Sequence, residues 1–406
     1  MSLIRPFRAL RPAPGRAEEV LAPPYDVLSS EEARERARGR PWSFLHISKP
    51  EIDLAADIDP YADAVYAKAA ENLERMVGEG VLVRDAVPGY YVYRLTREGR
   101  SQTGLAAVAS VADYRTNRIR KHELTTPVKE DDRVRQIEAV NAETGPVMIA
   151  YDDAPEVDAI LAAAAAGPAE VDVTWADGVR HQMWPITEAG AIDALTRAVD
   201  SLPAIYIADG HHRSAAASRV AEARKDAPES VRSFLAVLFP AAEMTILGYH
   251  RVIRDLNGMD GDALLAALGR DFAVDPAPEP VEPRSAGVFG MYLGGRWYRL
   301  TVRPELVDQD PIGRLPITIL TRRVIEPLFG ITDQRKDKRI DFVGGGRGLA
   351  ELARRVDSGD KAVAFALYPT QMSDLIAVAD AGEIMPPKST WFEPKLADGL
   401  VSHVLD

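Results

Sequence analysis

Residues 204–224 of the chain read AIYIADGHHRSAAASRVAEAR. The first five residues form a short apolar run that predicts a buried strand. The alanine-rich run at 214–225 predicts a helix, because alanine is the best helix former. Between the two lies the polar turn DGHHR at 209–213. A strand, a tight turn and a helix in direct succession are typical of proteins that mix both kinds of element.

The same alternation continues along the rest of the chain. A capped helix is expected after Ser29, and the apolar spacing of 61–77 predicts a second helix. The other predicted helices are 133–142, 157–166, 192–199, 317–328 and 348–356. The predicted strands are 89–95, 104–111, 147–153, 171–174, 178–184, 234–239, 287–292, 297–302 and 362–367. We therefore expect an α/β or mixed α+β protein.

The segment 274–283 (VDPAPEPVEP) interrupts this alternation. It carries four prolines and only acidic charges, which favours an extended, solvated chain. It predicts either a linker or a loop inside one domain. The regions expected on this basis are 1–146, 147–273 and 284–406, and they could also form one intertwined domain.

Composition excludes several classes of function. The chain has 406 residues, a formal net charge of −12 and no cysteine. Disulfides, thiolate catalysis and cysteine-based metal sites are therefore excluded. The acidic balance argues against nucleic acid as a partner and against binding to an anionic membrane surface. No apolar run reaches the length of a membrane helix, and the basic N-terminus lacks the apolar core of a secretory signal, so we expect a cytoplasmic protein.

The DGHHR turn is the strongest candidate for chemistry. The start of a helix offers backbone N–H groups and a positive dipole end, which suit an anion. Gly210 allows close approach of a ligand, and Arg213 adds a fork of donors suited to phosphate oxygens. His211 and His212 point in directions about 100° apart on a helix, so they are not expected to bind one metal together. Asp209 could cap the helix, hold a metal or act as a base, and an exposed polar turn is the alternative.

Four other motifs are weaker candidates. His122 and Glu123 could transfer protons, but the second histidine of a zinc-protease helix is missing. The turn PPYD at 23–26, the segment MPPKSTWFEPK at 385–395 and the glycine run GGGRG at 344–348 could each line a pocket or cradle a phosphate. The alternatives are a plain turn, a terminal strand and a flexible loop.

Several of these motifs together resemble a known family. They are PFRALRP (6–12), PPYDV (23–27), SFLH (43–46), HE (122–123), EDDR (130–133), ADGHHR (208–213) and MPPKST (385–390). As a set they resemble the bacterial and archaeal "domain of unknown function 1015" family, from residue 4 to about residue 402. The name of that family implies no activity.

A second, shorter resemblance implies a chemistry. Gly210, Arg213 and Ala216 match the spacing of the phosphate-binding segment of the ParB/sulfiredoxin-like superfamily. Free-serine kinases of that superfamily carry a similar Asp-Gly-His-x-Arg segment. The resemblance implies a ParB/sulfiredoxin-like phosphate-binding core and phosphoryl transfer to a small hydroxyl compound such as L-serine.

The function expected from these observations is that of a small-molecule kinase that uses ATP, ADP or pyrophosphate with Mg²⁺. The expected catalytic residues are Asp209, His211, His212, His122 and Glu123. The expected cofactor-binding residues are Gly210, Arg213, Ser214, Lys388, Ser389 and Thr390. The expected substrate-binding residues are Tyr25, Asp26, Glu130 and Arg133, and Asp209 could hold Mg²⁺ through phosphate oxygens. A homodimer is possible. The alternatives are a nucleotide-binding regulatory protein without catalysis and a phosphoester hydrolase.

Overall fold

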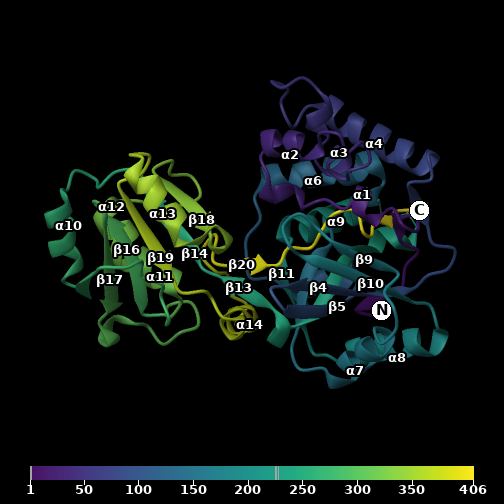
Figure 1. Ribbon diagram of the computed structural model, residues 1–406. Helices are drawn as coiled ribbons and strands as arrows, with labels where there is room; N and C mark the ends of the chain where they lie inside the picture. Colours follow the sequence, from purple (N-terminus) through teal and green to yellow (C-terminus); the bar gives the residue numbers. More distant parts are fainter. Residues whose placement is uncertain (1, 225, 227) are drawn as a thin grey trace. The chain divides into compact units, whose positions relative to one another are not determined.

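The computed structural model describes residues 2–224, 226 and 228–406 (Figure 1). Contacts divide the chain into two compact units. Unit 1 consists of Met1–Lys121, Thr125–Met244 and Pro394–Asp406, and unit 2 consists of His122–Leu124 and Thr245–Glu393. The expected region 147–273 is thus divided after residue 244, and the end of the chain returns to unit 1.

Unit 1 is built on a nine-stranded mixed sheet in the order β6-β11-β8-β12-β5-β4-β10-β9, with β1 paired to β5. Two neighbouring pairs, β6 with β11 and β8 with β12, are parallel, and the other pairs are antiparallel. The strands of this sheet are β1 (Ile4–Arg5), β4 (Tyr90–Arg97), β5 (Arg100–Ser110), β6 (Ile119–Arg120), β8 (Val147–Tyr151), β9 (Val171–Thr174), β10 (Arg180–Ile186), β11 (Ile205–Asp209) and β12 (Ser233–Pro240).

Helices cover this sheet, and two small strand pairs complete the unit. Figure 1 shows α7 and α8 on one side of the sheet and α6 on the other. The helices are α1 (Ala17–Val20), α2 (Ser30–Ala37), α3 (Leu45–Ser48), α4 (Asp63–Gly78), α5 (Val111–Arg115), α6 (Pro127–Val140), α7 (Pro155–Ala164), α8 (Ala189–Asp200) and α9 (His211–Ala223). The pairs are β2 (Leu10–Pro12) with β3 (Leu82–Arg84), and β7 (Ala142–Glu143) with β21 (His403–Val404).

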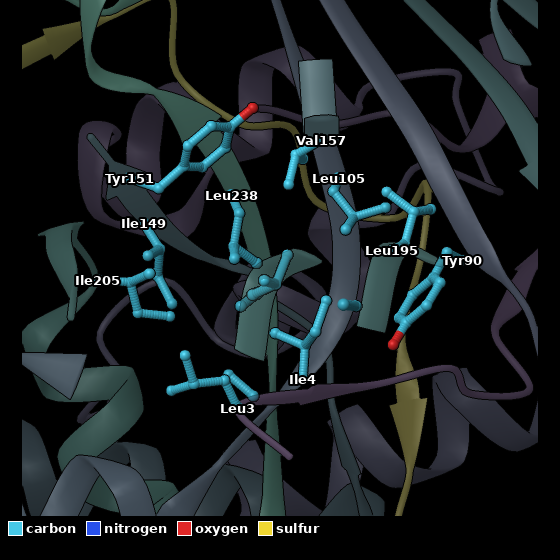
Figure 2. Close-up of a cluster of buried hydrophobic side chains, with 14 of the residues drawn as sticks. Leu3, Ile4, Tyr90, Leu105, Ile149, Tyr151, Val157, Leu195, Ile205 and Leu238 are labelled. Carbon is cyan, nitrogen blue, oxygen red and sulfur yellow. The ribbon is translucent and has the colours of Figure 1, made fainter. Parts of the chain in front are cut away.

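The core of unit 1 lies between the sheet and the helices α7 and α8 (Figure 2). Its members come from distant parts of the sequence, including Leu3 and Ile4 of the N-terminal segment. Two tyrosines place their rings in the cluster and their hydroxyls at its edge. Tyr90 bonds Thr196 at 2.7 Å, and Tyr151 donates to Asp158 at 2.6 Å. Each large apolar side chain buried here stabilises the fold by about 1.5–3 kcal/mol.

Unit 2 contains a six-stranded antiparallel sheet in the order β15-β17-β16-β19-β14-β18. The short strands β13 and β20 form a separate antiparallel pair. The strands are β13 (Thr245–Leu247), β14 (Tyr249–Ile253), β15 (Phe272–Ala277), β16 (Val288–Leu293), β17 (Arg296–Val302), β18 (Ile340–Gly344), β19 (Val363–Leu367) and β20 (Trp391–Glu393). The helices are α10 (Gly261–Leu268), α11 (Pro316–Leu320), α12 (Glu326–Phe329), α13 (Gly348–Asp357) and α14 (Met372–Asp380). A π-helical turn (Thr321–Ile325) joins α11 to α12.

The mixed α/β class expected from the sequence is confirmed. The predicted serine cap is present at Ser29, whose hydroxyl accepts from the Glu32 N–H, and the Glu32 side chain completes a capping box. Helix α9 begins at His211, three residues before the predicted start, and Lys225 at its predicted end lies outside the described residues. The linker expected at 274–283 is wrong in its first part. Residues 274–277 belong to β15, an edge strand, where a proline can be accommodated. No helix of the described residues is long and apolar enough to cross a membrane.

Candidate anion site at the start of α9

The strand–turn–helix unit predicted from the sequence is present in unit 1. Strand β11 ends at Asp209, and α9 begins at His211. Gly210 between them has φ +98°, a backbone conformation that glycine adopts without steric cost. A Cβ at Gly210 would lie 3.0 Å from Arg213 Nε, so the missing side chain also lets the guanidinium approach the turn. Gly210 is the N-cap residue, and no side chain of the described residues caps α9, so Asp209 does not take the capping role, one of the three considered for it.

Arg213 is held by acceptors around the turn. Its Nη2 lies 2.9 Å from Asp209 Oδ2 and 4.0 Å from Asp26 Oδ2, and its Nη1 donates to the carbonyl of Pro146. Its Nε is buried and has no hydrogen-bond partner among the described residues. The side chain of Arg213 is therefore fixed by two of its three nitrogens and keeps one donor unused.

Asp209 lies between two cations. Arg213 contacts one of its oxygens, and Lys395 Nζ lies 3.5 Å from the other, Oδ1. Burial alone would raise the pKa of Asp209, but Lys395 and Arg213 outweigh burial and hold the pKa well below its ordinary value. Asp209 is therefore a carboxylate at neutral pH, and its charge offsets part of the positive charge of Arg213 and Lys395.

The PPYD turn lies at the same place. Asp26 approaches Arg213, and the Arg133 Cζ lies 3.9 Å from the centre of the Tyr25 ring. Arg133 also donates to Asp132 Oδ2 from Nε and Nη2, at 2.9 and 2.7 Å. Burial raises the pKa of Tyr25 to about 12, so its hydroxyl stays protonated. The structure thus brings three of the four predicted substrate-binding residues to the DGHHR turn.

The two histidines of the turn differ in their surroundings. His212 Nε2 accepts a hydrogen bond from the Thr126 backbone N–H at 3.1 Å, which assigns the proton of the neutral ring to Nδ1. His211 is buried, and its carbonyl accepts from the hydroxyl of Ser214 at 3.0 Å. Ser214 is fully buried, and that bond commits its hydroxyl to the backbone of the helix.

Glu130, the fourth predicted substrate-binding residue, lies on α6, where α6 packs against α9. Its carboxylate pairs with Arg219 of α9, with Nη1 and Oε2 3.3 Å apart, and accepts from the hydroxyl of Thr125. Arg219 lies on α9, and Thr125 lies just before the start of α6. Glu130 therefore connects these two helices, and its contacts differ from those of Arg213.

A cavity of about 30 Å³ lies behind Arg213, large enough for water. Two acids that the sequence analysis missed, Glu143 and Asp398, line it together with Arg213, Tyr25 and Arg133. Burial raises the pKa of Glu143 to about 8 and the pKa of Asp398 to about 7. Neither acid lies in a recognisable motif, and Asp398 reaches the cavity only because the end of the chain pairs with Ala22. Lys395 was within a quoted motif but was not assigned to the site.

The remaining predicted residues belong to unit 2. His122 is buried, and its carbonyl accepts from the Met385 N–H at 2.8 Å. The HE motif therefore lies beside the start of the MPPKST motif, although about 260 residues separate them in sequence. Ser389 donates from Oγ to the carbonyl of Pro386 at 2.5 Å. Lys388 and Thr390 flank it in the same turn.

Comparisons with known proteins agree with the family resemblance. The family model described as protein of unknown function (DUF1015) matches residues 4–318. The chain belongs to this family. Among curated proteins, none matches it in sequence.

Three solved structures are among those that the chain matches at low identity. A conserved hypothetical protein from Pyrococcus furiosus is 13% identical, with 73% of this chain and 94% of that chain covered and a TM-score of 0.37. A free serine kinase in complex with AMP is 12% identical, with 71% and 86% covered and a TM-score of 0.36. The protein SbnI from Staphylococcus aureus, with a C-terminal truncation, is 11% identical, with 73% and 86% covered and a TM-score of 0.39.

Proposed function

We propose that this DUF1015 protein is a small-molecule phosphotransferase, and that a small hydroxyl compound, with L-serine the first to test, accepts the phosphoryl group. The observation that carries the proposal is Arg213. A buried guanidinium at the first turn of a helix without a side-chain cap has one unused donor, Nε. Phosphoryl transfer needs fixed positive charge and positioning more than covalent chemistry, and this arrangement supplies both.

The residues around Arg213 take distinct roles in this proposal. Arg213, Gly210 and the first N–H groups of α9 hold phosphate oxygens. Asp209 holds the guanidinium in place, because it forms the ion pair at 2.9 Å. His211 and His212 are the proposed proton carriers, and in neutral His212 the ring proton is on Nδ1.

Tyr25, Asp26 and Arg133 are proposed to bind the acceptor. Asp26 offers a carboxylate 4.0 Å from Arg213, and it is exposed enough (39% of the side chain) to meet a ligand. His122, Glu123, Lys388, Ser389 and Thr390 of unit 2 keep their predicted roles in catalysis and donor binding. Ser214 remains a proposed cofactor-binding residue. Its backbone would bind the cofactor, because its hydroxyl donates to the carbonyl of His211.

Mg²⁺ is the metal proposed for this reaction, since it neutralises phosphate charge when bound. Asp209 is the residue proposed to face it. The low pKa of Asp209 keeps the carboxylate charged, as an oxygen ligand of Mg²⁺ requires, and 28% of the side chain is exposed. Lys395 Nζ lies near Oδ1 of Asp209. To bind Mg²⁺ directly through Oδ1, Asp209 would lose that contact; otherwise it would act on Mg²⁺ through the phosphate oxygens.

The test is a transfer assay with ATP, ADP and pyrophosphate against L-serine and other small hydroxyl compounds, with Mg²⁺ present. Arg213→Gln should abolish transfer. The matched control is Arg180→Gln, which should leave transfer unchanged. Among the residues that the structure describes, this arginine of unit 1 pairs only with Asp172 on the neighbouring strand β9. Absence of transfer with every donor would refute the proposal.

Two other outcomes identify the alternatives. Nucleotide-dependent thermal stabilisation without turnover would indicate a binding protein. Release of phosphate from phosphoserine without a donor would indicate a phosphoester hydrolase.

A further inference from the structure

Arg251 is a buried cation without an acid. It lies in the middle of β14 in unit 2, and its exposed fraction is 0%. Its Nη1 donates to the carbonyl of Tyr249 at 2.6 Å, and its Nη2 donates to the carbonyl of Pro387 at 2.9 Å. No carboxylate of the described residues pairs with it, and its Nε is buried without a hydrogen-bond partner among the same residues. Burying an uncompensated charge costs several kcal/mol, so such a residue calls for an anion nearby.

Aromatic rings surround this guanidinium. The Arg251 Cζ lies 5.1 Å from the centre of the Phe342 ring and 5.9 Å from that of Tyr249. Trp391 packs edge-on against Tyr249, with the ring centres 5.2 Å apart. Cation–π contacts of this kind offset part of the cost of burial, but they neutralise no charge. Burial accordingly lowers the pKa of Arg251 to about 9, which still leaves it charged at neutral pH.

A second cation is held over the same tyrosine. The Lys388 Nζ lies 5.8 Å from the centre of the Tyr249 ring. Lys388 has φ +57°, a left-handed conformation that is strained for a residue other than glycine. Strain of this kind persists only where the surroundings impose it, and it occurs often at binding sites.

The turn that carries Lys388 is pinned from three sides. Arg251 donates to the carbonyl of Pro387, Thr370 donates from Oγ1 to the carbonyl of Ser389 at 2.8 Å, and Ser389 donates to that of Pro386. A lysine on a turn held this firmly is placed for a ligand before the ligand arrives. The Tyr249 hydroxyl beside it is half-buried and makes no hydrogen bond to the residues that the structure describes.

We propose that Lys388 and Tyr249 form an oxyanion site on unit 2, with Arg251 as the buried positioning residue, and that the ligand is a phosphate or diphosphate group. Lys388 and the Tyr249 hydroxyl contact the anion. Arg251 holds the turn and adds positive charge from beneath. This inference rests on the proposed function in one respect, because the anion would be part of the phosphate donor. Binding of the anion can nevertheless be measured without turnover.

The experiment uses the full chain with inorganic phosphate and pyrophosphate as probes, against sodium chloride at equal ionic strength and against acetate. Binding is followed by thermal stabilisation and by tryptophan fluorescence, because Trp391 contacts Tyr249. The wild type should be stabilised by pyrophosphate and phosphate beyond the chloride control. Stabilisation by acetate equal to that by phosphate would overturn the phosphate assignment.

The variants test the named residues. Lys388→Gln and Tyr249→Phe should each raise the half-saturating pyrophosphate concentration about tenfold, the size expected for one charge-assisted or neutral hydrogen bond in a partly buried site. Lys388→Arg should bind within about threefold of the wild type, since it keeps the charge. The matched control is Lys336→Gln, an 83% exposed lysine of unit 2, which should bind like the wild type.

Three results would overturn the proposal. The first is that phosphate and pyrophosphate stabilise the wild type no more than chloride does. The second is that Lys388→Gln binds pyrophosphate as tightly as the wild type. The third is that the stabilisation by pyrophosphate is lost in Arg213→Gln and kept in Lys388→Gln. Arg251→Gln should weaken binding where it folds, and the Lys388 variants decide the question where it does not. Phosphoryl transfer by the wild type together with unchanged pyrophosphate binding in Lys388→Gln would refute this site and leave the proposed function standing. Pyrophosphate binding that Lys388→Gln weakens, without transfer to any acceptor, would refute the proposed function and leave this site standing.

Discussion

Glu143→Gln should stabilise unit 1, and its effect should grow with pH. Glu143 is buried, and its carboxylate accepts from the Leu235 backbone N–H. That single bond does not offset the loss of hydration, so burial raises the pKa of Glu143 from 4.5 to about 8. Folding at neutral pH therefore requires this carboxylate to take up a proton. A glutamine has nearly the same shape, can accept the same hydrogen bond and needs no proton.

The sign and size follow from proton linkage. Between pH 4.5 and 8 the folded protein holds a proton on Glu143 that the unfolded chain has released, so the free energy of unfolding of the wild type falls as pH rises. A pKa difference of about 3.5 corresponds to about 5 kcal/mol, because each unit is worth about 1.4 kcal/mol. The contribution of protonated Glu143 to the free energy of unfolding is fully present below pH 4.5 and is lost by about pH 8. Glu143→Gln should therefore gain about 3 kcal/mol over the wild type at pH 7.

The measurement is urea unfolding of the wild type and the variant at several values between about pH 5 and about pH 8. The difference in unfolding free energy should rise with pH. Glu79→Gln is the control, because it removes an exposed glutamate just after α4, and its difference should not change with pH. Parallel pH profiles for the wild type and Glu143→Gln would refute the claim that burial keeps this acid protonated.

Three further substitutions test the packing, the capping and the site. Gly104→Ala should cost about 3 kcal/mol of unfolding free energy, because the new Cβ would lie 2.5 Å from the carbonyl oxygen of Leu238 on the neighbouring strand; an unchanged midpoint in urea would contradict this. Ser29→Ala should cost about 1 kcal/mol, as the capping box of α2 is lost, and denaturant unfolding would show it. Asp209→Asn should cost about 2 kcal/mol, less than for a fully buried pair, because it leaves the buried Arg213 without its closest carboxylate; a melting temperature equal to that of the wild type would count against the ion pair.

The sequence predicted the elements of the fold and one centre of the site. The hairpin of β4 and β5, the hairpin of β9 and β10, and the unit of β11 and α9 all follow from local periodicity and from turn residues such as Gly178 and Gly210. The motifs alone left open whether PPYD meets DGHHR. The structure shows this meeting, since Asp26 lies 4.0 Å from Arg213.

Other features had no local signal. Pairing of the chain end with Ala22 places Asp398 and Lys395 at the site, and such long-range contacts leave no periodic pattern. The same holds for Arg251, which reads in sequence as an ordinary polar residue of a strand. Its isolation from every described acid appears only when β14, β18 and the Lys388 turn come together.

The chain by itself determined the mixed α/β class and predicted one candidate site. A chain with no cysteine, a net charge of −12 and a strand–Gly–helix turn bearing histidines and arginine favours the hypothesis of a small anion held locally. Only the tertiary structure decided the state of the charged groups. Asp209 is kept ionised by two cations, whereas Glu143 is held protonated by burial. The two acids differ because the pKa of a carboxyl group depends on the water and charge around it, and folding alone sets both.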